Sequence, residues 1–277
     1  MFLGSSLEKN GGMYDKALSY YVQAAMNGHY DAFLSMSAYF IDEGFGVSQD
    51  LHRAEAYARK ARSLNPDCGL LSNRSLLNTA VAYIDANDSG NANTILLAIA
   101  QETDENALDG PLCADVAARL WNAGKCQSSA EMYARSFCHG RVESANSASF
   151  MFFCGGKCTL SKLWLDVACK SKSLYTSEVI ASTGEKLIWQ DTRSHRDATR
   201  IELRQMRDSC GGCGVALSGE TRKYCRRCLT YCYCNEDCQK QHWEGGHREE
   251  CQEVEEHMRN ILRAIRIGRF DWVQKMV

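Results

Sequence analysis

Seven cysteines and one histidine within residues 210–251 constrain this chain more than any other feature. Their spacing is Cys-x2-Cys, Cys-x2-Cys, Cys-x3-Cys and His-x3-Cys, formed by Cys210, Cys213, Cys225, Cys228, Cys234, Cys238, His247 and Cys251. Thiolate and imidazole are the ligands that Zn²⁺ prefers, and a closed structural site takes four of them in a tetrahedron. Eight donors make two complete sets with no position left for water or substrate. The spacing therefore predicts two structural zinc ions.

The spacing resembles the MYND-type zinc finger, and residues between the ligands match that family as well. They are Tyr233, Gln239 and Trp243, while Asn235 stands where many members have serine. The resemblance covers 42 of 277 residues. It implies that the ligands interleave, with one ion bound by Cys210, Cys213, Cys234 and Cys238 and the other by Cys225, Cys228, His247 and Cys251.

Two of the ligand positions have a nearby rival of the same residue type. Cys232 also follows a tyrosine, but it would leave five residues before the next ligand where the pattern has three, so we assign Cys234. His242 competes with His247, but only His247 lies i, i+4 from the terminal cysteine, which suits one face of a helix. We expect Cys232 to remain outside the metal sites and His242 to pack or hydrogen-bond nearby.

The remaining cysteines do not suggest a disulfide framework. Such a framework needs an oxidising compartment and a secretory signal, whereas the chain begins MFLGS without a basic or an apolar leader region. We therefore expect a reducing cytoplasm or nucleus. Cys154 and Cys158, at i, i+4, are the one pair that could form a metal or redox site, although burial in a helical core is the commoner role. The others are Cys68, Cys113, Cys126, Cys138, Cys169 and Cys232.

The composition predicts an all-α protein. Only 2 prolines interrupt the 277 residues, and alanine and leucine, which favour helices, are abundant. The net charge of −2 and the 45% hydrophobic content are typical of a globular chain rather than a disordered one. No apolar run approaches the 18 or so residues of a transmembrane helix. We predict a helical-repeat α-solenoid with a small C-terminal cross-brace zinc-finger module.

The first 65 residues contain an internal repeat. A small residue is followed by an aromatic residue three positions later and by a second small residue seven positions later, which we call the 0/3/7 pattern. It occurs twice at an offset of 37, as Ala17, Tyr20 and Ala24 and as Ala54, Tyr57 and Ala61. These positions share one helical face, so we expect all six to be buried. Glycine turns at 10–13 and 44–47 precede the copies, and a period near 37 indicates stacked helix–turn–helix units. With Asp50, the second copy resembles the Sel-like branch of the tetratricopeptide repeats; two hairpins that are merely alike are the alternative.

The rest of the chain shows helical periodicity without a clear repeat. It predicts helices over 74–86, 92–101 and 112–123. A diverged 0/3/7 pattern at Ser161, Trp164 and Ala168 leaves a third unit open. The predicted domains are Sel-like repeats (1–65), further helices (66–175), a connecting helix (176–209), the MYND-type finger (210–251) and a C-terminal helix (252–277) whose apolar positions are Val254, Met258, Ile261, Leu262 and Ile265.

Sequence motifs of catalysis are missing. The sequence has no phosphate loop, no Gly-x-Ser-x-Gly elbow and no His-Glu-x2-His motif. Some MYND proteins carry the finger inside a SET methyltransferase, but this finger follows a helical array and only 26 residues come after it. We expect a protein that is not an enzyme, with a methyltransferase-related protein as the weakest alternative.

Nucleic-acid binding receives little support from the charge distribution. Residues 210–251 contain six Lys/Arg and six Asp/Glu, so the finger has no net basic field to neutralise phosphates. A transcriptional regulator that contacts nucleic acid through the finger remains an alternative.

The function that we expect is a protein–protein interaction adaptor without a membrane partner. The MYND resemblance implies that the finger binds short proline-containing peptides, with an extended peptide along a strand edge. Gln239 would hydrogen-bond the peptide backbone and Trp243 would supply an aromatic face, since residues four apart share a helical face. The alternative for Trp243 is packing against the zinc sites. The helical array would add a second protein-binding surface.

Overall fold

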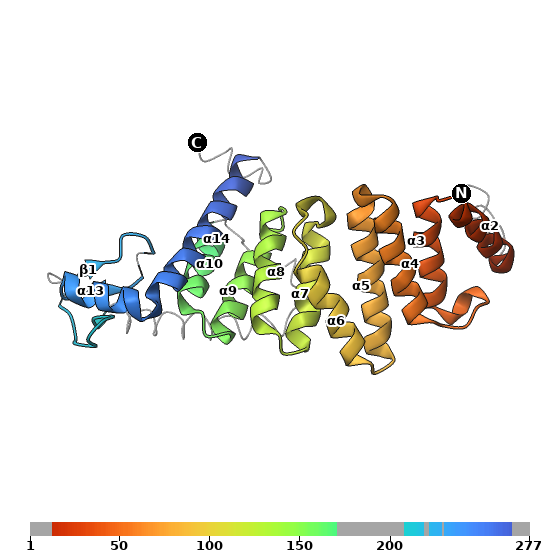
Figure 1. Ribbon diagram of the computed structural model, residues 1–277. Coiled ribbons are helices and arrows are strands. Elements are labelled where there is room, and N and C mark those ends of the chain that lie inside the picture. The colour runs from red at the N-terminus through yellow and green to blue at the C-terminus, as the bar shows by residue number, and fades with distance from the viewer. Residues whose placement is uncertain (1–12, 171–207, 219–221, 229, 268–277) are drawn as a thin grey trace. The chain divides into compact units, whose positions relative to one another are not determined.

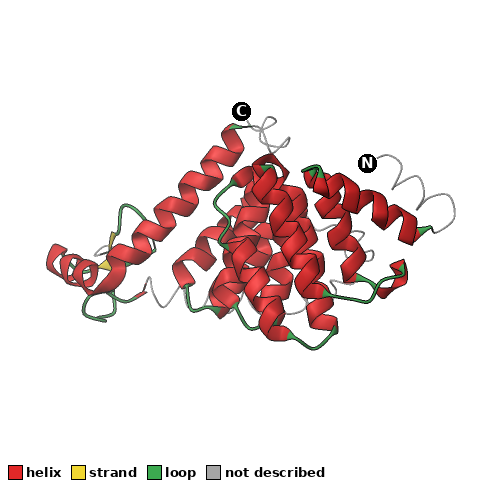
Figure 2. Cartoon of the chain, turned by 45° about the vertical axis from the view of Figure 1, so that its right-hand side comes forward, coloured by secondary structure: helices red, strands yellow, loops and turns green. Residues whose placement is uncertain are grey.

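The computed structural model describes residues 13–170, 208–218, 222–228 and 230–267. Within these ranges the protein is mostly helical, and a small cysteine-rich module lies near its C-terminal end (Figure 1). Figure 2 shows helices throughout, apart from one pair of short strands in that module. The predicted fold class is therefore confirmed. The chain divides into two compact units, residues 1–124 and 125–277, and each is described by itself.

The first unit is a series of helices in which each packs against the next in sequence. Such nearest-neighbour packing is the arrangement of a helical array. The helices are α2 (Tyr14–Met26), α3 (Tyr30–Ile41), α4 (Leu51–Leu64), α5 (Gly69–Asp85), α6 (Ser89–Ala100) and α7 (Gly110–Asn122), with short 3₁₀ turns η1 (Glu43–Phe45), η2 (Pro66–Cys68) and η3 (Glu105–Ala107) between them. None of the described helices is both long and apolar enough to cross a bilayer.

Three alanines of the predicted repeat, Ala17, Ala24 and Ala54, lie where α2, α3 and α4 meet. Ala17, Ala54 and Ala61 are completely buried, and Ala24 is partly buried against the same cluster. Small side chains at these positions allow the helix backbones to approach closely. The small positions of the 0/3/7 pattern therefore pack as expected.

The aromatic position of the pattern behaves differently. Tyr20 is 43% exposed, so the prediction that it is buried is wrong. Tyr21 is buried in its place, because it lies i, i+4 from Ala17 and so on the same side of α2. In the second copy Tyr57 is only half-buried.

The glycine turn before α4 has the geometry that its sequence predicts. Gly46 has a φ of +80°, a left-handed conformation that residues with a Cβ adopt rarely. Asp50 then begins α4, with its Oδ1 accepting a hydrogen bond of 3.0 Å from the backbone N–H of Arg53. Of the first turn, residues 10–12 lie outside the described residues.

The next three helices exist as predicted but begin two to five residues earlier. Side-chain caps explain two of these starts. Asp88 accepts a hydrogen bond of 3.1 Å from Asn91 N–H at α6, and Asp109 accepts one of 2.8 Å from Leu112 N–H at α7. In α6 the first turn, Ser89–Asn91, is polar and the apolar pattern starts only after it, so periodicity alone places this helix start too late.

In the described residues of the second unit, three helices precede the cysteine-rich module. The helices are α8 (Cys126–Cys138), α9 (Ser144–Cys154) and α10 (Cys158–Lys170), and α9 packs against both of the others. Ser161, Trp164 and Ala168, the third 0/3/7 set, are all buried. Cys154 ends α9 and Cys158 begins α10, so their i, i+4 spacing spans a turn rather than one helical face. The side chain of Cys158 lies outside the described residues.

The module is built from an antiparallel strand pair and two helices joined by a kinked turn. Its elements are β1 (Lys223–Tyr224), β2 (Cys232–Tyr233), α13 (Glu236–His242), the π-helical turn η5 (Trp243–His247) and α14 (Arg248–Arg266). Lys223 pairs with Tyr233 and Tyr224 with Cys232. The predicted connecting helix over 176–209 lies almost entirely outside the described residues, as does the end of the predicted C-terminal helix after residue 267.

Helix α14 extends beyond the zinc ligands and packs against α8 and α10. The predicted apolar face of this helix is only partly correct. Val254 and Ile261 are buried, whereas Met258 and Leu262 are 41% and 49% exposed. His257 lies on the packed side instead. Its ring centroid is 5.3 Å from that of Phe152 and 5.8 Å from that of Trp164. A helix that belongs partly to the module thus completes the packing of the helices before it.

Candidate metal centre

The first ligand set consists of four thiols from two segments of the module. Cys210 and Cys213 come from the N-terminal knuckle, Cys234 follows β2, and Cys238 lies in α13. The Sγ atoms of Cys213 and Cys234 are 3.8 Å apart, and those of Cys234 and Cys238 are 3.4 Å apart. All four donor atoms lie within 4.8 Å of one another.

The second set consists of three thiols and one imidazole, all buried. Cys225 and Cys228 form a knuckle after β1, while His247 and Cys251 lie on either side of the start of α14. The Nε2 atom of His247 is 3.4 Å from Cys225 Sγ and 3.7 Å from Cys228 Sγ. The Sγ atoms of Cys225 and Cys251 are 3.9 Å apart.

These separations fit tetrahedral zinc. With Zn–S bonds of about 2.3 Å and Zn–N bonds of about 2.0 Å, two sulfurs are about 3.8 Å apart and a sulfur and a nitrogen about 3.5 Å apart. The observed distances lie around these values. The interleaved assignment to two zinc ions is confirmed, and each set is complete with four donors. Bound zinc would act here as a cross-link between segments of the chain.

Local sequence features bring the first set together. A Cβ atom on Gly212 would lie 2.4 Å from the backbone oxygen of Cys238, so only glycine allows the knuckle to lie against α13. Asn235 begins α13, with its Oδ1 accepting a hydrogen bond of 2.8 Å from Cys238 N–H. Asparagine and serine are comparable helix caps. The departure from the family pattern at Asn235 therefore preserves the cap.

One thiol in each set is favoured as the thiolate, which is the form that binds metal. Burial raises the pKa of Cys210, but hydrogen bonds from backbone N–H groups outweigh burial and lower it to about 6. A hydrogen bond from the Cys228 thiol lowers the pKa of Cys225 to about 3 and raises that of Cys228 itself. At Cys238 the side-chain hydrogen bond with Cys234 is the largest cause that raises the pKa of the thiol, to about 12, with burial next.

The two rival residues are not ligands. Cys232 is buried, and its Sγ lies 3.5 Å from the backbone oxygen of Ser209. The His242 Nδ1 atom and the Tyr233 hydroxyl share a hydrogen bond of 3.0 Å. The His242 ring stacks on that of His247, with the two ring centroids 4.9 Å apart. Cys234 and His247 are therefore the correct choices, and His242 packs beside the second site as expected.

A carboxylate behind His247 was not found from the sequence. Glu250 Oε2 lies 3.7 Å from His247 Nδ1, the ring nitrogen that faces away from the thiols. Glu250 also accepts a hydrogen bond from the Thr159 hydroxyl of α10. Burial raises the pKa of Glu250, but His247 and Thr159 outweigh burial and lower it. Its spacing of three residues after His247 on a helix was the only available sequence signal.

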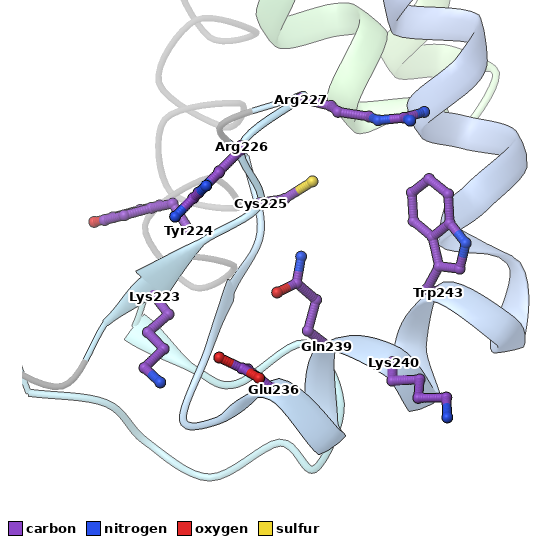
Figure 3. Close-up of a pocket in the computed structure, with 9 residues that line it drawn as sticks. All are labelled: Lys223, Tyr224, Cys225, Arg226, Arg227, Glu236, Gln239, Lys240 and Trp243. Atoms are coloured by element: carbon purple, nitrogen blue, oxygen red, sulfur yellow. The ribbon is translucent and has the colours of Figure 1, made fainter.

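A groove of about 1000 Å³ lies beside the zinc sites. Gln239 and Trp243 both line it, together with β1 and the knuckle that follows it (Figure 3). Trp243 is half-buried, with its ring 5.9 Å from that of His247 and 5.3 Å from the guanidinium carbon of Arg227. The sequence did not reveal that Arg227 reaches this ring.

Comparison with known families agrees with this geometry. The family model of the MYND finger matches residues 210–251, which contain both ligand sets. Among curated proteins, none matches the chain. The chain thus carries a zinc-binding module of the MYND type, a class of domain that mediates protein interactions, and the match does not extend to the helices before it.

Proposed function

We propose that the protein is a non-enzymatic adaptor whose zinc finger binds short proline-containing peptides in the groove beside β1. The observation that carries the proposal is the position of Gln239 and Trp243, which line one groove although neither is a zinc ligand. The resemblance to MYND-type fingers supplies the peptide class. Zinc would hold the groove in shape without taking part in any reaction.

The strand pair offers an edge for an extended peptide. Cys225 N–H donates a hydrogen bond of 2.9 Å to the Tyr231 carbonyl, so Cys225 and Tyr231 form a hydrogen-bonded pair. In an antiparallel ladder such pairs alternate with non-hydrogen-bonded pairs, and Tyr224 with Cys232 is the next pair. By this alternation the backbone N–H and C=O of Tyr224 point away from β2. Tyr224 also lines the groove and is 40% exposed. A peptide strand beside β1 would satisfy those backbone groups.

The polar and aromatic groups suit a proline-containing segment. Proline lacks a backbone donor, so part of such a peptide needs an apolar contact rather than a hydrogen bond. The half-buried indole of Trp243 provides that contact, and a large rigid ring is the kind of group that dominates binding energy. Figure 3 shows Gln239 between β1 and Trp243, where its amide can reach the peptide backbone.

Trp243→Ala tests the proposal. We expect it to weaken binding of a proline-rich peptide about 30-fold or more, the loss typical of an interface hot spot, while two zinc ions per chain remain bound. Isothermal titration against a proline-rich peptide library and elemental analysis would measure the two properties in parallel. Trp243→Phe should recover part of the affinity because it keeps an aromatic face.

Val215→Ala is the matched control, since Val215 is an apolar finger residue that is 59% exposed and does not line the groove. Its affinity should equal that of the wild type. Loss of zinc from Trp243→Ala would show that the indole is part of the module's core. A wild-type chain that binds no proline-rich peptide but binds a nucleic acid specifically would contradict the adaptor function.

A further inference from the structure

The groove beside β1 has a strong charge imbalance that the finger as a whole does not have. Four cationic side chains line it, against a single carboxylate, that of Glu236. The cations are Lys223 of β1, Arg226 and Arg227 of the following knuckle, and Lys240 of α13. Over residues 210–251, by contrast, the six basic and six acidic residues balance. Folding therefore concentrates positive charge at this one surface.

Most of these cations have no carboxylate partner within the described part of the chain. In that part of the chain, no salt bridge involves Lys223, Arg226 or Lys240. Arg227 is the exception, with its Nη1 3.7 Å from Glu255 Oε2, and its guanidinium also lies over the Trp243 ring. Three of the four cations thus lack a carboxylate partner among the described residues, whereas the Arg227 guanidinium packs on the indole.

The charges surround the positions proposed to bind the peptide. Figure 3 shows Gln239 in the middle, Lys223 on the β1 side, and Arg226 and Arg227 beyond Cys225. Lys240 lies next to Gln239 in sequence and points to the outer side of α13 (Figure 3). An extended peptide with its apolar segment against Trp243 would place its flanking residues near these cations.

We propose that the groove selects proline-containing peptides whose flanking residues are Asp or Glu. The inference rests on the proposed function and adds the chemistry of the partner. Surface ion pairs each contribute little, but they discriminate well, since a basic flank would meet like charge at the same positions. The cations would thus determine which proline-containing segments bind.

An acidic peptide fits the observations better than a nucleic acid does. A nucleic acid needs a row of phosphate contacts along an extended basic surface. Here the basic residues share one groove with Glu236, and α13 begins with the two acidic residues Glu236 and Asp237. The backbone groups of Tyr224 that point away from β2 also match a peptide rather than a phosphate backbone.

The test uses the zinc-loaded 277-residue chain and three peptides with one proline-rich core, flanked by acidic, neutral or basic residues. At about 0.05 M salt we expect the acidic peptide to bind about three- to tenfold more tightly than the neutral one, and the basic peptide to bind most weakly. At about 1 M salt, where the Debye length is about 3 Å, the difference should nearly vanish.

A charge-matched pair of variants assigns the effect to the groove. Lys223→Gln with Lys240→Gln should remove most of the preference for the acidic peptide, with little change for the neutral one. Arg259→Gln with Arg263→Gln removes the same charge from exposed positions of α14 that do not line the groove, and should keep the preference. Equal zinc content in both variants confirms that the module is folded.

The outcomes separate the two proposals. If no peptide with the proline-rich core binds, the proposed function itself fails. If the neutral and acidic peptides bind equally, or if both double variants lose the preference equally, the adaptor function stands and the acidic selectivity is overturned. Tighter binding of an oligonucleotide than of the acidic peptide, lost in the Lys223/Lys240 variant, would assign the charge to nucleic acid and overturn the inference.

Discussion

The zinc module and the helices α2–α7 are stabilised by different means. In the described part of residues 210–251, the buried apolar residues other than cysteine are Leu217 and Tyr233. In α6 and α7, by contrast, long aliphatic side chains are almost completely buried, among them Leu96, Leu112 and Leu120. A segment with so small an apolar core needs covalent or metal cross-links, whereas the helices can be stable through packing alone.

The helices α8–α10 show that this contrast is not a simple boundary. They have a buried core around Trp164, but α14 covers part of it, and α14 begins at the second ligand set. Lys157 Nζ lies 2.9 Å from Glu253 Oε2, and His257 Nε2 lies 3.4 Å from Glu131 Oε2, so polar contacts join the same surfaces. Metal should therefore matter indirectly for α8–α10 and not for α2–α7.

The largest effect should come from a ligand that is lost. Cys228→Ala breaks the second set, and structural zinc in small fingers contributes on the order of 10–16 kcal/mol of apparent binding free energy. We expect the module to unfold and the start of α14 to become exposed to hydrogen exchange, while α2–α7 keep their protection. Elemental analysis with hydrogen exchange measures both.

Cys232→Ala provides the control, because Cys232 is a buried cysteine of the same module that is not a ligand. That variant should retain two zinc ions per chain. One ion or none in the wild type would disprove the two-site assignment. Loss of protection in α2–α7 after chelation would show that the two regions are not independent.

Three tyrosines of the first unit should form a graded series that leaves the metal sites untouched. Tyr39 is 3% exposed, Tyr57 is half-buried and Tyr20 is 43% exposed. Replacement by alanine should lower the free energy of unfolding by about 3–5 kcal/mol at Tyr39, by about 1–3 kcal/mol at Tyr57 and by under about 0.5 kcal/mol at Tyr20. Urea denaturation checks the order. A larger loss at Tyr20 than at Tyr57 would contradict the packing of α2.

Acid should destabilise the first unit through Glu102. A hydrogen bond from Arg62, the largest cause, lowers the pKa of Glu102 from 4.5 to about 2. Because the folded-state pKa is the lower one, the stabilisation is present above pH 4.5 and is lost as the pH falls toward 2.

Glu102→Gln should therefore lower the free energy of unfolding by about 1–3 kcal/mol at neutral pH and by little at pH 2. The side chain is 11% exposed, so solvent screens the pair only weakly. Glu105→Gln, a nearby exposed position, is the control. Between pH 7 and pH 2, the free energies of unfolding of the wild type and of Glu102→Gln should converge. A difference between them that does not change with pH would exclude the ionic contribution.

An effect on zinc affinity without unfolding should come from Glu250→Gln. This change keeps the side-chain volume but removes the negative charge 3.7 Å from His247 Nδ1, and loss of the carboxylate partner of a metal-binding histidine lowers metal affinity about 10- to 100-fold. We expect weaker zinc binding at one site only, measured by competition with a chelator. Thr159→Val should reproduce a smaller part of the loss. If neither change alters affinity, the contact with α10 does not orient His247.

The ligands could be predicted from the sequence because their geometry is local. A knuckle fixes two cysteines two residues apart, and a helix places His247 and Cys251 on one face, so spacing alone selected Cys234 over Cys232 and His247 over His242. The all-α class was equally accessible, since helical periodicity and scarce proline act over short segments.

Which face of each helix is buried was decided by the tertiary structure. The 0/3/7 pattern located the small residues correctly but selected Tyr20 rather than Tyr21 as the buried aromatic residue. Periodicity places the buried face of a helix with an uncertainty of about one residue, and the packing of neighbouring helices decides which residues lie at the centre of that face. Likewise Met258 and Leu262 of α14 continue an apolar pattern, yet the helices packed against α14 leave them exposed.

The groove and the support of the second zinc site depend on contacts that no local pattern encodes. Thr159 reaches Glu250 across 91 positions of the sequence, and the cations Lys223 and Lys240 line one groove only because β1 and α13 both border it. The spacing of ligands determined that this chain binds two zinc ions. Which side chains surround those ions, and what charge they present to a partner, follows from chain segments that only folding brings together.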